Sequence, residues 1–120
     1  MAVTNLTITS LAASEFQDTS NANSSVSVKG SAGTLYVVSV DNTANAAASY
    51  VKLYDTAGAV VVGTTVPDWV FKITALVAQP IVFVPGIAFA NGLAVCTVTA
   101  GGTAGSTSPS SAVIVRIVYT

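Results

Sequence analysis

Residues that could carry out chemistry are few in this sequence. The chain of 120 residues contains no histidine and one cysteine, Cys96. Serine and cysteine nucleophiles in enzymes depend on a neighbouring base, which is most often a histidine. A catalytic triad of the common kind therefore cannot form, and the sequence predicts a protein without enzymatic activity and without a cofactor. We expect Cys96, which stands among apolar residues, to pack in the core as a small apolar side chain.

The lysines and the acidic residues are explained by structure without catalysis. Lys29, Lys52 and Lys72 lie in or beside predicted strands, where a lysine is usually exposed to solvent. The acidic residues are Glu15, Asp18, Asp41, Asp55 and Asp68. All of them fall in predicted turns, where short acidic side chains bond to their own backbone. They therefore do not indicate the paired carboxylates of a glycoside hydrolase.

A calcium site is the alternative interpretation for Asp41, Asn42, Asn45 and Asp55. Oxygen ligands of this type, gathered at one end of a β-sandwich, could bind the ion. Calcium takes about six to eight oxygen ligands, however, and the spacing of these residues matches no EF-hand loop. Turn formation alone accounts for them, so we expect no bound metal.

The composition indicates a protein that works inside an assembly. Hydrophobic residues make up 52% of the chain and charged residues only 8%, whereas charged residues are about 25% of a typical soluble domain. A free monomer relies on surface charge for solubility, so we expect much of the surface to be covered by copies of the chain or by a larger assembly. The four basic residues are scattered and could not neutralise a run of phosphates, which argues against a nucleic-acid partner.

Neither a membrane segment nor a secretion signal is predicted. Residues 75–98 are the most apolar stretch and are long enough to span a bilayer, but Pro80 and Pro85 interrupt them. Residues 1–14 contain no basic side chain and no continuous apolar block. We therefore expect a chain that is made in the cytoplasm and has no membrane partner.

Two strands joined by a polar turn occupy the centre of the chain. Residues 35–40 and 50–54 are rich in β-branched and aromatic residues, and turn-forming residues separate them. This pattern predicts either a hairpin or two strands that cross between sheets. Because side chains alternate along a strand, a solvent-exposed Lys52 would place Val51 and Leu53 in the core.

Further strands are predicted from the same alternation. They cover residues 3–10, 26–29, 69–77, 81–84, 93–99 and 112–119. In the third of these, a solvent-exposed Lys72 would turn Trp69, Phe71 and Ile73 into the core. The prolines that flank residues 81–84 cannot donate hydrogen bonds to a neighbouring strand, so we expect that strand either at an edge of its sheet or between corners of the sandwich.

Two segments have compositions that predict loops. Residues 12–25 are predicted to be a polar loop or arm that Phe16 anchors, and residues 100–111 an exposed, flexible loop rich in glycine and serine. With about eight short strands, the chain is predicted to form one domain over residues 1–120, an all-β antiparallel sandwich of the jelly-roll type. The order of the strands cannot be read from the sequence.

The outward faces of the predicted strands are too apolar for water. Side chains that share a strand face with Lys52, Lys72 or Arg116 should point away from the core. They are Tyr50, Tyr54, Val70, Ile114 and Val118. We expect these residues to contact other copies of the chain or the larger assembly, because apolar residues on both sides of a strand indicate that both sides are buried.

Four segments carry a resemblance to a known family. They are VDNTANAAASYVKLYD, VGTTVPD, PGIAFANGLAVCTVTAGGTAGSTSP and the terminal AVIVRIVYT, and they lie within residues 34–120. These segments resemble small virion proteins of tailed bacteriophages that have a β-sandwich fold. The resemblance is greatest to the capsid decoration proteins, which are also called cement proteins.

The resemblance implies a structural role. Proteins of this family sit on the outer surface of an assembled capsid, often as trimers, and stabilise it. A member would be a homotrimer that binds the major capsid protein, and it would reside in the virion after synthesis in the host cytoplasm. The family has no shared catalytic motif, so no functional residue is carried over to this chain.

Two other roles stay open. The same segments are compatible with a structural component of a phage tail, neck or fibre. A carbohydrate-binding or adhesin-like β-sandwich would instead place aromatic side chains along one exposed face, for which Tyr36, Tyr50 and Tyr54 are the candidates. Binding to a glycan array would distinguish such a module from a structural protein.

Overall fold

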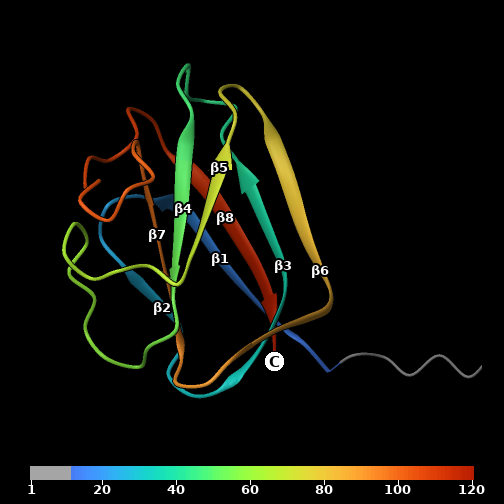
Figure 1. Ribbon diagram of the computed structural model, residues 1–120. Helices are drawn as coiled ribbons and strands as arrows, with labels where there is room; N and C mark the ends of the chain where they lie inside the picture. Colours follow the sequence, from blue (N-terminus) through green and yellow to red (C-terminus); the bar gives the residue numbers. More distant parts are fainter. Residues whose placement is uncertain (1–11) are drawn as a thin grey trace, which may run out of the picture.

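Regular structure consists entirely of β-strands in residues 12–120, the part of the chain that the computed structural model describes (Figure 1). The strands are β1 (Ser14–Asn21), β2 (Val26–Lys29), β3 (Gly33–Asp41), β4 (Ser49–Tyr54), β5 (Trp69–Ile73), β6 (Ala78–Phe89), β7 (Leu93–Val98) and β8 (Val113–Tyr119). They form two four-stranded sheets, sheet A in the order β1-β8-β3-β6 and sheet B in the order β2-β7-β4-β5. All neighbouring strands are antiparallel. The predicted all-β sandwich is confirmed, and its strand order is that of a jelly roll.

The core lies between the inner faces of the two sheets. In β8, Val113, Val115 and Ile117 are fully buried, whereas Arg116 between them is exposed. The other buried apolar side chains of this core are Val28, Leu35, Val38, Val40, Val51, Leu53, Ile73, Phe89, Leu93 and Val95. The alternation arises because each sheet turns every second side chain toward the other sheet.

The central strands cross between sheets, because β3 belongs to sheet A and β4 to sheet B. The second of the two predicted arrangements is therefore the right one. Val51 and Leu53 face the core as predicted. In β5, Trp69 and Phe71 pack against the core and are partly buried, and Lys72 is exposed, which also confirms the prediction.

The prediction that residues 12–25 form a loop or arm was wrong, because residues 14–21 form β1 at the edge of sheet A. β1 pairs with β8, and Phe16 stands opposite Ile117 and packs against the core. Its outward positions are polar because they face solvent, so the composition resembled that of a loop. The predicted strand at residues 3–10 lies outside the described residues.

β6 is the other edge strand of sheet A, and it is much longer than the predicted strand at residues 81–84. Pro80 and Pro85 lie within it rather than at its ends. The edge position is one of the two that were predicted, and a proline is tolerated there because no further strand needs its missing N–H. Phe83 of β6 lies near Phe71 of β5, with ring centroids 5.6 Å apart, and this contact joins the two sheets at their edges.

Candidate functional site

Lys52 lies on the outer face of sheet B and is completely buried, with 0% of its surface exposed. Its ammonium group donates hydrogen bonds to the carbonyl oxygens of Gly102 at 2.6 Å, Gly105 at 2.7 Å and Thr103 at 3.4 Å. The prediction that Lys52 reaches water was wrong. The loop of residues 99–112 folds over the sheet, and its carbonyl groups take the place of water around the charge.

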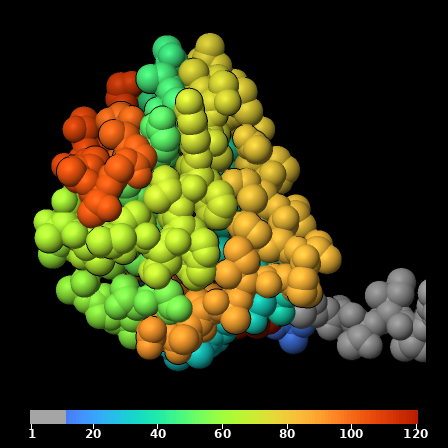
Figure 2. Space-filling model, viewed as in Figure 1, coloured from blue at the N-terminus to red at the C-terminus, as the bar shows by residue number. Residues whose placement is uncertain are grey.

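A second apolar cluster lies beneath the loops on this outer face. Tyr54, Ala94, Cys96 and Val98 are buried there, and Tyr50, Val60 and Val62 pack against them. The covering segments are residues 55–68 and 99–112, which appear in yellow-green and orange over this face in Figure 2.

The reasoning that placed Tyr54 on an open face was therefore wrong, since only 1% of Tyr54 is exposed and the chain's own loops cover it. Tyr50 is half-buried. A Cβ atom at Gly101 would come within 2.7 Å of the Tyr50 ring, so the loop approaches this ring at a residue that has no side chain. The segment that was predicted to be an exposed loop without packing thus covers a buried cluster.

Cys96 and Tyr54 are in contact inside this cluster, with 3.7 Å between the sulfur and the hydroxyl oxygen. Burial raises the pKa of the Cys96 thiol and also that of the Tyr54 hydroxyl. The thiolate is the nucleophilic form of cysteine, and burial disfavours it. Cys96 is therefore a packing residue, as predicted.

A network of buried polar side chains joins the loops at one end of the sandwich. The side-chain oxygen of Asn42 accepts hydrogen bonds from Asn45 and Ser49. The Asn42 amide donates to the carbonyl oxygens of Ala47 and Thr74. Because all these groups find partners within the protein, the network has a structural role.

A cavity of about 240 Å³ opens beside this network. Its lining consists of Asn45, Ala47, Ala48, Ser49, Thr99, Ser108, Pro109 and Ser110. No charged side chain belongs to this lining. Asn45 and Ser110 are already bonded to each other there, with 3.3 Å between the Ser110 hydroxyl and the Asn45 side-chain oxygen.

The candidate calcium ligands do not form one site. Asp41 accepts hydrogen bonds from Thr43, while Asn42 and Asn45 belong to the network described above. Asp55 follows the opposite end of β4, next to the β6–β7 turn. Within residues 12–120 no three cysteine or acidic side chains lie close enough together to hold a metal ion.

Asp55 holds the β6–β7 turn through its carboxylate. The oxygens accept backbone N–H groups from Ala90 at 2.9 Å, Asn91 at 2.8 Å and Gly92 at 3.4 Å. The bond from Ala90, followed by those from Asn91 and Gly92, keeps the pKa of the Asp55 carboxyl below its ordinary value of 3.8, although burial opposes this shift.

Asp55→Asn is expected to lower the free energy of unfolding by about 1 kcal/mol at neutral pH, since solvent screens these charged bonds at an exposed site. The folded pKa of Asp55 lies below the unfolded one, so its carboxylate stabilises the fold above the unfolded pKa. This stabilisation is lost as the pH falls through the folded pKa. Urea denaturation of wild type and variant should therefore give curves that converge in acid. Glu15→Gln is the control, and an equal pH dependence in both variants would contradict the assignment.

The three tyrosines of a possible glycan platform do not share an exposed face. Tyr36 belongs to β3 in sheet A, whereas Tyr50 and Tyr54 belong to β4 and lie beneath the loops of sheet B. Tyr36 itself is half-buried, and its ring lies beside Gly86 of β6.

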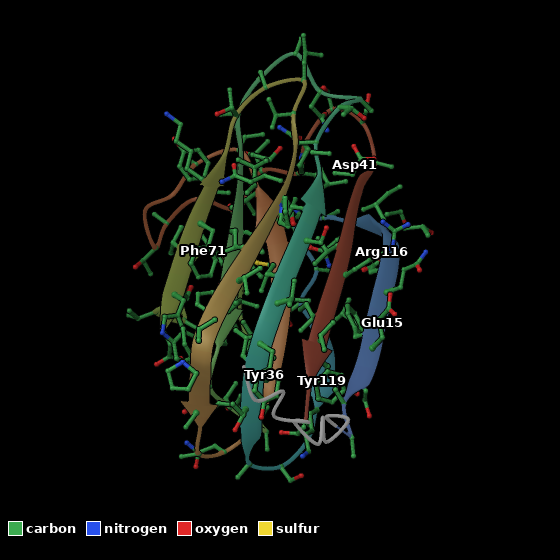
Figure 3. The ribbon with its side chains drawn as sticks, turned by 90° about the vertical axis from the view of Figure 1, so that its right-hand side faces the viewer. Glu15, Tyr36, Asp41, Phe71, Arg116 and Tyr119 are labelled. Carbon is green, nitrogen blue, oxygen red and sulfur yellow. The ribbon has the colours of Figure 1, made fainter. Side chains whose placement is uncertain are left out.

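An open apolar surface is present on the outer face of sheet A, onto which Figure 3 looks. The strand register places Val82 of β6, Val37 of β3 and Val118 of β8 side by side in one row. Val82 is 63% exposed, and Val84, two residues further along β6, is 89% exposed. Ile114 lies on the same face of β8 and is half-buried. We call these five residues the sheet A patch.

Of the five predicted contact residues, Ile114 and Val118 thus lie on an open face. Val70 stands opposite Lys52 in sheet B and is 38% exposed, at the margin of the loop-covered face.

Comparison with protein-family models and with curated proteins finds no match for this chain. In residues 12–120 there is no helix with the length and apolar character needed to cross a membrane.

Proposed function

We propose that this protein is a non-enzymatic structural component of a bacteriophage virion, and that it decorates and stabilises the outer surface of the capsid as a homo-oligomer. The observation that carries the proposal is the sheet A patch, an open apolar surface on a sandwich that has very few charged residues. A surface of this kind marks a contact with another protein. Three parts of the proposal come from the resemblance alone: the location in a virion, the major capsid protein as partner, and the trimer.

The buried chemistry of the chain supports a structural role. Lys52 is engaged by backbone carbonyls, and Cys96 is enclosed with Tyr54. The Asn42 network is satisfied internally. These groups hold loops onto the sandwich, which favours a rigid building block.

Adding the purified protein to assembled capsids that lack it should raise their resistance to heat. A protein that binds the assembled shell and not its dissociated subunits stabilises the shell by mass action, by about 2.7 kcal/mol per site at a concentration one hundred times its dissociation constant. Cosedimentation and thermal release of the packaged genome would measure binding and stability. Binding to purified tails in place of heads would favour a tail or neck component, and binding to a glycan array would favour the adhesin-like alternative.

A further inference from the structure

We propose that another copy of this chain covers the sheet A patch, with the same face of each copy turned toward a common symmetry axis. The inference deepens the proposed function, because it rests on the homo-oligomer proposed there. It does not depend on where in a virion the oligomer sits. In a dimer, the sheet A patches of the two copies would pack directly against each other. In a trimer, the three patches would surround the symmetry axis.

The two outer faces of the sandwich differ in how they are covered. Both carry large apolar side chains, but sheet B keeps its own beneath residues 55–68 and 99–112. The described part of the chain lays no loop across sheet A, so the row of Val82, Val37 and Val118 faces outward (Figure 3). An apolar row on a sheet is stable in water when a second layer covers it.

The distribution of charge favours a copy of the chain as this layer. The face carries both signs: Figure 3 shows Arg116 and Glu15 on the strands at one side and Asp41 near one end. Arg116 donates a bond of 3.4 Å to Gln17 through Nε, and within residues 12–120 its terminal guanidinium nitrogens have no partner. These nitrogens could bind a carboxylate on the same face of another copy.

The centre of the patch is suited to a symmetry axis. Residues near such an axis meet their own copies, so a charged residue there would face a like charge. The sequence has no charged residue between Lys72 and Arg116, and all of β6 falls in this interval. The apolar rows of neighbouring copies can therefore contact one another at the axis without charge repulsion.

The size of the face approaches that of a standard contact. Strands about 4.8 Å apart give a sheet of four strands a width of about 19 Å, and the nine residues of β3 extend for about 30 Å. The projected area of the sheet is then about 600 Å², and its accessible surface is larger because the side chains protrude. A standard interface buries about 800 Å² of accessible surface on each partner.

Light scattering and sedimentation of the full chain at micromolar concentration test the proposal. Wild type should have a mass that is a multiple of the 12.0 kDa chain. Val82→Lys should raise the dissociation constant of the oligomer by about tenfold or more, because it places a charge in the apolar row. Val66→Lys is the matched control, since Val66 is 71% exposed in the loop before β5 and should leave the mass unchanged.

A second pair of variants keeps the test decisive if Val82→Lys does not fold. Arg116→Glu removes the basic group of the face and should weaken the oligomer, whereas Lys72→Glu makes the same change of charge on β5 and should not. Circular dichroism confirms the fold of each variant.

Several results would overturn the inference. A monomeric wild type would overturn the homo-oligomer together with this contact, and a rise in apolar-dye binding after deletion of residues 2–11 would then identify the chain's own N-terminal segment as the cover. An oligomer that keeps its mass in folded Val82→Lys and Arg116→Glu would overturn only the choice of face. Equal weakening by the control variants would do the same.

Discussion

Lys52→Met is expected to lower the free energy of unfolding by about 3 kcal/mol, because two short hydrogen bonds from a charged donor are lost, and such bonds contribute about 1.5 to 3 kcal/mol each. The ammonium of Lys52 holds the carbonyl groups of Gly102 and Gly105. Methionine has nearly the same length but donates no hydrogen bond. The loop of residues 99–112 should then detach from sheet B more easily.

The reactivity of Cys96 toward a thiol reagent reports that detachment directly. Cys96 is the single cysteine of the chain and is fully buried beneath the loop. A thiol reagent should therefore modify the native variant faster than native wild type. Lys72→Met removes an exposed lysine from β5 and should change the free energy of unfolding by less than about 0.5 kcal/mol. Full stability and a protected Cys96 in Lys52→Met would show that the carbonyl contacts do not hold the loop.

Lys52 also shows what alternation along a strand can and cannot predict. The alternation assigned the two sides of β4 correctly, with Val51 and Leu53 toward the core and Lys52 away from it. It could not show what covers the outer side, since the covering loop begins 47 positions later, at residue 99. The loop holds Lys52 through backbone carbonyl groups. Because every residue has such a group, the sequence gives no sign of this contact.

The positions of most strands were predictable because they depend on local sequence patterns. The order of the strands depends on contacts between distant segments. β1 pairs with β8, which lies at the other end of the chain. Each partner has the alternation of an ordinary strand, and the alternation does not specify the neighbour. β1 itself was missed because Phe16 is its only large apolar residue.

The apolar composition led us to expect outer surfaces that other chains cover. On sheet B the cover is intramolecular, so Tyr54 was assigned to the wrong kind of contact. On sheet A, Ile114 and Val118 lie on an open face together with Val37 and Val82. The last two could have been included if the register between β3 and β6 had been known.

Asn42→Ala is expected to cost about 3 kcal/mol of stability, since buried groups that lose their hydrogen-bond partner are each destabilised by about 1 to 3 kcal/mol. Asn42 is fully buried and bonds to Asn45, Ser49 and the carbonyl oxygens of Ala47 and Thr74. Alanine would remove these four bonds where the chain passes from sheet A to sheet B, and the Asn45 side chain would keep only its bonds to Ser110 and Ser111.

Asn42→Asp tests whether hydrogen bonding, and not side-chain volume, is the cause. The aspartate has nearly the same shape, but one of its oxygens would face the carbonyl oxygens of Ala47 and Thr74 in place of the amide nitrogen. Burial and this repulsion should raise the folded pKa of the introduced carboxyl above its unfolded value. The variant should therefore be least stable at neutral pH and recover as the pH falls through that raised pKa. Asn23→Ala removes an exposed asparagine that donates to the Ser106 carbonyl at 2.9 Å, and it should cost about 1 kcal/mol or less at any pH. If Asn42→Asp were as stable as wild type at neutral pH, the buried network would not be holding the loops at this end of the sandwich.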